Sequence, residues 1–186
     1  MTVDEFLRWS EALPKEAGKF ELIDGEVVVR HGSVAQQQSE RSQHWVAKTA
    51  MGIALHDAIR RSGLPYRMAI DGPSIRMSDH KLVQPDVLVY CGEKLPRDVF
   101  DVPNPPIVVE VLSPGTERRD HGVKFEGYFA LPSLQHYLIV DPDRPAVIHH
   151  KRGVGNTIET RIVKEPALRL DPPGIEVDLS EVLAAP

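Results

Sequence analysis

Residues Val108 to Phe129 have the sequence VVEVLSPGTERRDHGVKFEGYF, in which Glu110 interrupts an apolar run that begins at Ile107. The run is typical of a buried strand, and the stretch from Glu117 to Leu131 that follows it is typical of a helix. A carboxylate inside a buried strand is costly unless a partner compensates its charge. Glu110 is therefore either a structural ion pair or part of a site that binds a metal or carries out chemistry.

The rest of the sequence predicts strands mixed with helices. Thr2 and Glu5 have the spacing of a capping box and predict a helix to about Leu13. Two strand-like runs flank Asp24-Gly25, which predicts a hairpin with a type I′ turn. The other expected elements are a helix from Val34 to Ser62, strands at YRMAI, SIRM, VQPDVLVY, IVVEVL and HYLIVD, a hairpin of PAVIHHKR and NTIETRIVK, and a short C-terminal helix.

This order of elements indicates a mixed α+β (α/β) fold in a single domain, residues 1–186, with helices packed on a mixed sheet after an N-terminal helix and hairpin. A content of 41% hydrophobic and 26% charged residues is globular rather than disordered. No apolar run is long enough to span a bilayer and the N-terminus does not resemble a secretory signal, so we expect a cytoplasmic protein. The net charge of −5 argues against a nucleic-acid coat protein. No G-x-x-x-x-G-K-[ST] motif occurs, so no nucleotide cofactor is expected.

Two acidic residues in neighbouring predicted strands define a candidate metal site. Side chains alternate along a strand, so Asp86 in VQPDVLVY and Glu110 in IVVEVL converge at one end if the two strands pair. Carboxylates held that close repel each other unless a proton or cation lies between them. Hard oxygen ligands of this kind suit Mg²⁺ or Mn²⁺.

The helix after Glu110 adds a cation to this site. Asp120, Lys124 and Tyr128 are spaced i, i+4, i+8 and share one helical face, so Lys124 can reach the carboxylates. A metal that polarises a phosphate and acidifies a water, beside a lysine that orients the water or stabilises negative charge, suits phosphodiester hydrolysis. His44, on the long expected helix, is a further candidate for the cleft.

Five motifs occur here in a specific order: ELIDGE, QPDVLVY, VVEVLSP, the D-x-x-x-K-x-x-x-Y helix and HYLIVDP. From about Phe20 to Pro142 this sequence resembles the Uma-type restriction endonucleases of the PD-(D/E)-x-K nuclease superfamily. The resemblance implies a restriction-endonuclease-like fold, a Mg²⁺ or Mn²⁺ cofactor, DNA as the substrate, and catalytic roles for Asp86, Glu110 and Lys124.

The resemblance also extends the list of site residues. Leu112 occupies the usual position of the lysine, which the family carries on the following helix, here as Lys124. Val111 would offer its backbone carbonyl to the metal, Glu21 would complete the metal site, and Gln84 would line the cleft.

Other interpretations stay open. Glu110 and Lys124 could form a purely structural pair, or Lys124 could pair with Asp120 on a solvated helix face. The protein could be an inactive, homodimeric interaction or regulatory protein that retains the nuclease fold, or a metal-dependent hydrolase of another phosphoester. The acidic charge favours the interaction protein, whereas three polar residues at positions suited to apolar ones favour the enzyme.

Overall fold

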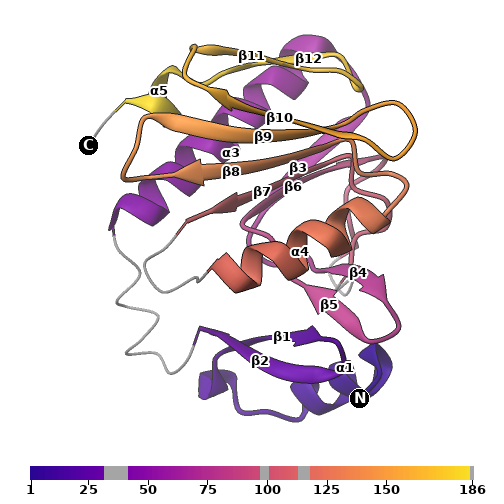
Figure 1. Ribbon diagram of the computed structural model, residues 1–186. Coiled ribbons are helices and arrows are strands. Elements are labelled where there is room, and N and C mark those ends of the chain that lie inside the picture. Colours follow the sequence, from indigo (N-terminus) through magenta and orange to yellow (C-terminus); the bar gives the residue numbers. More distant parts are fainter. Residues whose placement is uncertain (32–41, 97–100, 113–117, 185–186) are drawn as a thin grey trace.

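A six-stranded mixed sheet in the order β10-β9-β8-β7-β6-β3 forms the centre of the structure (Figure 1). The structure is a computed structural model that describes residues 1–31, 42–96, 101–112 and 118–184, without the side chains of Lys15, His31, Ser42 and residues 118–121. Strands β7 and β8 are parallel and the other neighbours are antiparallel. The strands are β3 (Tyr66–Ile70), β6 (Val87–Cys91), β7 (Ile107–Val111), β8 (His136–Asp141), β9 (Ala146–Arg152) and β10 (Ile158–Val163).

One long helix covers each face of this sheet, α3 (Ser42–Ser62) on one side and α4 (Arg118–Ala130) on the other (Figure 1). The alternation of β6 explains both contacts. Val87 and Val89 join the core cluster that contains α3, and Leu88 and Tyr90 join the cluster that contains Tyr128 of α4. Both faces of the central strands are therefore apolar, and a polar residue there requires a specific partner.

A second sheet, in the order β2-β1-β5-β4, packs beside α4 and the N-terminal helix α1 (Val3–Glu11). Its strands are β1 (Lys19–Ile23), β2 (Glu26–His31), β4 (Ile75–Ser78) and β5 (Lys81–Val83), and a short 3-10 helix, η1 (Lys15–Ala17), precedes β1. The expected capping box is confirmed, since Thr2 and Glu5 bond reciprocally at the start of α1. The expected turn is confirmed too, with Asp24 at φ 51° and Gly25 at φ 82° between paired strands.

One expected strand was wrong and two strands were missed. VQPDVLVY is not continuous: Val83 ends β5 in the small sheet, and β6 begins at Val87 in the large sheet. Pro85, which lacks a backbone N–H, lies where the chain crosses between the sheets. A further hairpin, β11 (Ala167–Leu170) and β12 (Ile175–Asp178), packs on α3 before the short α5 (Ser180–Leu183).

The expected strands at YRMAI, SIRM, IVVEVL and HYLIVD and the expected hairpin of PAVIHHKR and NTIETRIVK are confirmed. The fold class is confirmed as a mixed sheet flanked by helices. The first eight residues of the expected helix from Val34 to Ser62 lie outside the described part of the chain. Among the described helices, none is both long enough and apolar enough to cross a membrane.

Candidate active site

The pairing of β6 with β7 brings the two central carboxylates to the same end of the strand pair. The antiparallel register pairs Val87 with Val109 and Leu88 with Val108, which brings Asp86, just before β6, opposite Glu110. Asp86 is 2% and Glu110 5% exposed. Both groups are thus removed from water and depend on protein partners.

Helix α4 supplies the partners of Glu110. Lys124 Nζ lies 3.3 Å from Glu110 Oε1, and the Tyr128 hydroxyl donates a 2.7 Å hydrogen bond to the same oxygen. Burial is the main cause that raises the pKa of Glu110, opposed by the Lys124 charge and reinforced by Asp86. Burial and the Glu110 charge also raise the pKa of Tyr128 well above its usual value, so this hydroxyl stays a donor.

Glu21 of β1 completes the carboxylate set. It is 3% exposed, accepts a 2.9 Å hydrogen bond from the backbone N–H of Gln84, and lies 3.3 Å from Lys124 Nζ. Lys124 therefore bridges Glu21 and Glu110. Glu110 and Lys124 do form an ion pair, as a purely structural role would require. The pair belongs, however, to a larger buried cluster.

Asp86 is held by different groups. Its Oδ1 accepts a 2.7 Å hydrogen bond from Arg30, and its Oδ2 accepts one of 2.8 Å from the backbone N–H of Val111. Burial would raise the pKa of Asp86, but nearby His44, the Arg30 charge and the Val111 amide together hold it well below its usual range. Asp86 is thus an anion, and its charge is balanced locally.

His44 of α3 lies against the same strand end. Its Nε2 is 3.1 Å from the Val111 carbonyl and 3.6 Å from Asp86 Oδ2. A carbonyl oxygen only accepts, so Nε2 carries the proton and His44 donates to Val111. The predicted cleft residue is therefore part of the cluster, and it occupies the carbonyl expected to be a metal ligand.

Of the remaining predicted residues, Gln84 lies in the site and Asp120 is untested. The Gln84 side chain accepts from Arg30 at 3.1 Å and donates to the Gly72 carbonyl at 2.6 Å. The Asp120 side chain lies outside the described part of the structure.

Sequence reasoning missed Arg30 and a neighbouring ion pair. Lys48, one turn after His44 on α3, is 4% exposed and lies 3.0 Å from Asp71 Oδ2. Lys48 and His44 are spaced i, i+4 and so share a helical face. This spacing could have identified Lys48 as a neighbour of the site from the sequence. Arg30 lies in an irregular stretch of β2 and gives no such signal.

The residue types of the cluster fit a hard divalent cation. Three carboxylates and a carbonyl are oxygen donors, and with the carboxylates ionised the permanent charges of Arg30 and Lys124 leave an excess of one negative charge. Within the described part of the chain, however, no three His, Cys, Asp or Glu side chains are grouped closely enough to share an ion. The ligand chemistry is present, in an arrangement where protein cations hold the carboxylates.

The fold is that of a restriction-endonuclease-like protein. A crystal structure described as a putative nuclease belonging to DUF820, from Anabaena variabilis, matches with a TM-score of 0.72 at 17% identity, over 99% of this chain and 98% of that chain. The model of the Uma2 family, described as "Putative restriction endonuclease", matches residues 3–185, so this chain belongs to the Uma2 family. An uncharacterized protein of Synechocystis sp. is 28% identical over 167 residues, 84% of this chain and 77% of its own length.

Proposed function

We propose that this protein is a metal-dependent DNA endonuclease that hydrolyses phosphodiester bonds. The observation that carries the proposal is the gathering of three buried carboxylates at the end of β7, with Glu21 and Glu110 held by Lys124 and Asp86 held by Arg30. Buried charges of this number are poorly explained by stability alone, since buried ion pairs seldom stabilise a fold more than apolar packing does. Membership of the Uma2 family supports a nuclease activity.

Each residue has a proposed role. Asp86, Glu110 and the Val111 carbonyl would hold Mg²⁺ or Mn²⁺, which when bound supplies positive charge to the phosphate and acidifies a water. Glu21 would join them once the three carboxylates, which are not grouped closely enough to share an ion in this structure, move together. Lys124 Nζ donates to the attacking water or to the phosphate oxygen on which charge develops. Tyr128 fixes the Glu110 carboxylate through its 2.7 Å hydrogen bond, and His44 fixes the backbone at Val111.

The experiment is a Mn²⁺ titration by calorimetry with a screen for DNA cleavage. We expect saturable binding and Mn²⁺-dependent cleavage by the wild type, and loss of both in Asp86→Asn and Glu110→Gln, which keep size and shape. Lys124→Met should retain binding and lose cleavage. Asp143→Asn, at an exposed turn, is the matched control and should behave as the wild type.

Two outcomes would revise the proposal. Folded wild-type protein with neither Mn²⁺ binding nor cleavage would leave Glu110 as a buried charge paired with Lys124. Cleavage of a small phosphodiester but of no DNA substrate would keep the chemistry and reassign the substrate.

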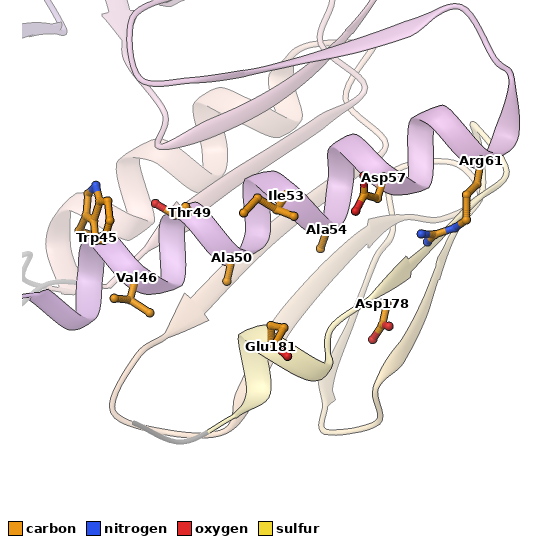
Figure 2. Close-up of a pocket in the computed structure, with 10 residues that line it drawn as sticks. All are labelled: Trp45, Val46, Thr49, Ala50, Ile53, Ala54, Asp57, Arg61, Asp178 and Glu181. Atoms are coloured by element: carbon orange, nitrogen blue, oxygen red, sulfur yellow. The ribbon is translucent and has the colours of Figure 1, made fainter.

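A second proposed property is homodimerisation through the exposed face of α3. Trp45, Val46 and Ile53 are 58%, 53% and 57% exposed, and they border a groove of about 350 Å³ between α3 and α5 (Figure 2). Trp45, Thr49 and Ile53 follow one another along the helix at intervals of four. In an antiparallel pair centred on Thr49, each Trp45 meets the Ile53 of the other copy, the self-complementarity that a two-fold interface needs.

Sedimentation velocity tests this second proposal. We expect the wild type to sediment as a dimer and Ile53→Lys as a folded monomer, because a charge would be buried in the interface. Val154→Lys, at a 93% exposed position far along the chain, is the control and should remain dimeric. A monomeric wild type at high protein concentration would contradict the proposal.

A further inference from the structure

Arg30 occupies an unusual position in β2. The pairing with β1 joins Lys19 to His31 and Phe20 to Val29, so the register skips Arg30. Such a bulge turns a side chain away from the direction that regular alternation would give it. Here the guanidinium points into the carboxylate cluster, where it donates to Asp86 and Gln84 at 2.7 and 3.1 Å.

Arg30 and Lys124 separate the three carboxylates in a fixed order. Arg30 contacts Asp86 and lies 3.8 Å from Glu21, and Lys124 lies 3.3 Å from both Glu21 and Glu110. Anions and cations therefore alternate through the site. The oxygen of Asp86 that carries no backbone hydrogen bond is the one that Arg30 holds.

We propose that Arg30 is the counter-ion of Asp86 in the metal-free protein, and that a divalent cation binds only as Arg30 releases Asp86, so that Arg30 sets the metal affinity. This inference rests on the proposed metal-dependent function. It concerns a residue that positions and neutralises Asp86, not one that reacts.

The charges of the cluster favour this exchange. Three ionised carboxylates with Arg30 and Lys124 have a net charge of −1, and without Arg30 the net charge is −2, which one divalent cation neutralises. A guanidinium left beside a bound dication would repel it in a site of low dielectric constant. The position of Arg30 also allows it to move, since β2 is an edge strand and the adjacent Val29 is 56% exposed.

The first test is a Mn²⁺ titration of Arg30→Gln against the wild type, by calorimetry without DNA. We expect the Kd of the variant to be lower by about tenfold or more, because binding no longer requires an ion pair to break. Arg76→Gln is the matched control, since Arg76 also pairs with an aspartate, Asp4, at 2.7 Å but outside the site. Its Kd should equal that of the wild type.

The outcomes separate this inference from the function on which it rests. An unchanged or higher Kd in Arg30→Gln, with clear binding by the wild type, would overturn the role of Arg30 and leave the nuclease proposal intact. Binding by neither protein would overturn both.

A second measurement uses the wild type alone, so it does not depend on the folding of a variant. A dicarbonyl reagent specific for arginine, followed by peptide mass spectrometry, reports how accessible each guanidinium is. Arg30, whose side chain is 10% exposed, should react slowly without Mn²⁺ and several-fold faster at saturating Mn²⁺. Exposed Arg67 serves as the internal reference. Equal reactivity of Arg30 with and without bound Mn²⁺ would contradict its release.

Discussion

At the scale of single residues, the buried carboxylates differ in how their charges are compensated. Asp86 accepts one hydrogen bond from the Arg30 guanidinium and one from the Val111 amide, and its pKa is lowered overall. For Glu110, burial raises the pKa although the Lys124 charge opposes the shift. The Tyr128 hydroxyl donates a 2.7 Å hydrogen bond to Glu110, shorter than the 3.3 Å between Glu110 and Lys124 Nζ. The hydroxyl of Tyr128 is therefore important for keeping Glu110 ionised inside the fold.

We predict that Tyr128→Phe destabilises the protein by about 1.5–3 kcal/mol, the range for a hydrogen bond to a charged group. It should also raise the pKa of Glu110 further, because a donor to the ionised form is lost. Urea unfolding at neutral pH measures the first effect. Tyr66→Phe, a half-buried tyrosine of β3, is the control. Equal stability of Tyr128→Phe and wild type would show that the hydroxyl does not support Glu110.

At the scale of elements, α4 combines two glycines with different surroundings. A Cβ added at Gly127 would overlap the Met77 sulfur of β4, whereas a Cβ at Gly122 would meet no atom of the described residues within 4 Å. Gly127 thus allows the close approach of α4 to β4 that keeps Lys124 and Tyr128 over the site. Gly122 lowers the helix propensity without a packing reason that the structure shows.

We predict opposite effects of alanine at these two positions. Gly122→Ala should stabilise the protein by up to about 1 kcal/mol through helix propensity. Gly127→Ala should lose that gain and destabilise by about 1 kcal/mol or more, because Met77 must move in a packed region. Thermal unfolding of both variants beside the wild type measures the difference. A Tm for Gly127→Ala as high as that for Gly122→Ala would mean that Met77 adapts freely.

At the scale of the whole molecule, a buried histidine pair joins the large sheet to the C-terminal region. Arg161 donates to His149 Nδ1 at 3.1 Å, so His149 carries its proton on Nε2 and donates to His136 Nδ1 at 2.8 Å. His136 in turn donates from Nε2 to the Pro172 carbonyl at 2.7 Å. Both imidazole rings are therefore neutral. A second proton on either ring would sit on the nitrogen that now accepts, so two hydrogen-bond donors would face each other.

From these hydrogen bonds between neutral histidines we predict that the protein loses stability in weak acid. Burial, reinforced by the positive charges nearby, lowers the pKa of His136 to about 4 and that of His149 to about 3. The charged groups that act on the pair are Lys151, Arg161 and Asp171. Between these values and about 6.5 the unfolded chain binds more protons, so the free energy of unfolding falls as the pH falls through that window. We expect a loss of several kcal/mol, since one unit of pKa shift corresponds to about 1.4 kcal/mol, and Tm against pH measures it.

The raised pKa of Glu110 makes the free energy of unfolding rise as the pH falls over part of this window, opposite to the effect of the histidines. A variant is therefore needed to assign the pH dependence to the histidine pair. His149→Gln should flatten the dependence of Tm on pH between about 6.5 and 4. His56→Gln, at an exposed position of α3, should leave it unchanged. An undiminished slope in His149→Gln would exclude the pair as its source.

Much of the fold could be predicted because local patterns carry it. The turn at Asp24-Gly25, the buried strand around Glu110 and the shared face of Lys124 and Tyr128 follow from turn chemistry and side-chain periodicity, and the structure confirms them. The convergence of Asp86 with Glu110 needed one added assumption, that the two strands pair, which the register confirms.

Three features could not be predicted, because they depend on contacts between residues far apart in the chain. They are the position of Arg30, the break between strands at Pro85 and the histidine pair. The bulge that turns Arg30 inward arises from pairing with β1, and Arg30 then bonds Asp86, which lies 56 residues later in the sequence. Sequence periodicity describes which side of a strand or helix a residue occupies, but not which distant group lies there. The amino-acid order therefore established that Asp86, Glu110 and Lys124 could form a site. The tertiary packing decided which cation neutralises which carboxylate, since charges removed from water take the partners that the fold brings within reach.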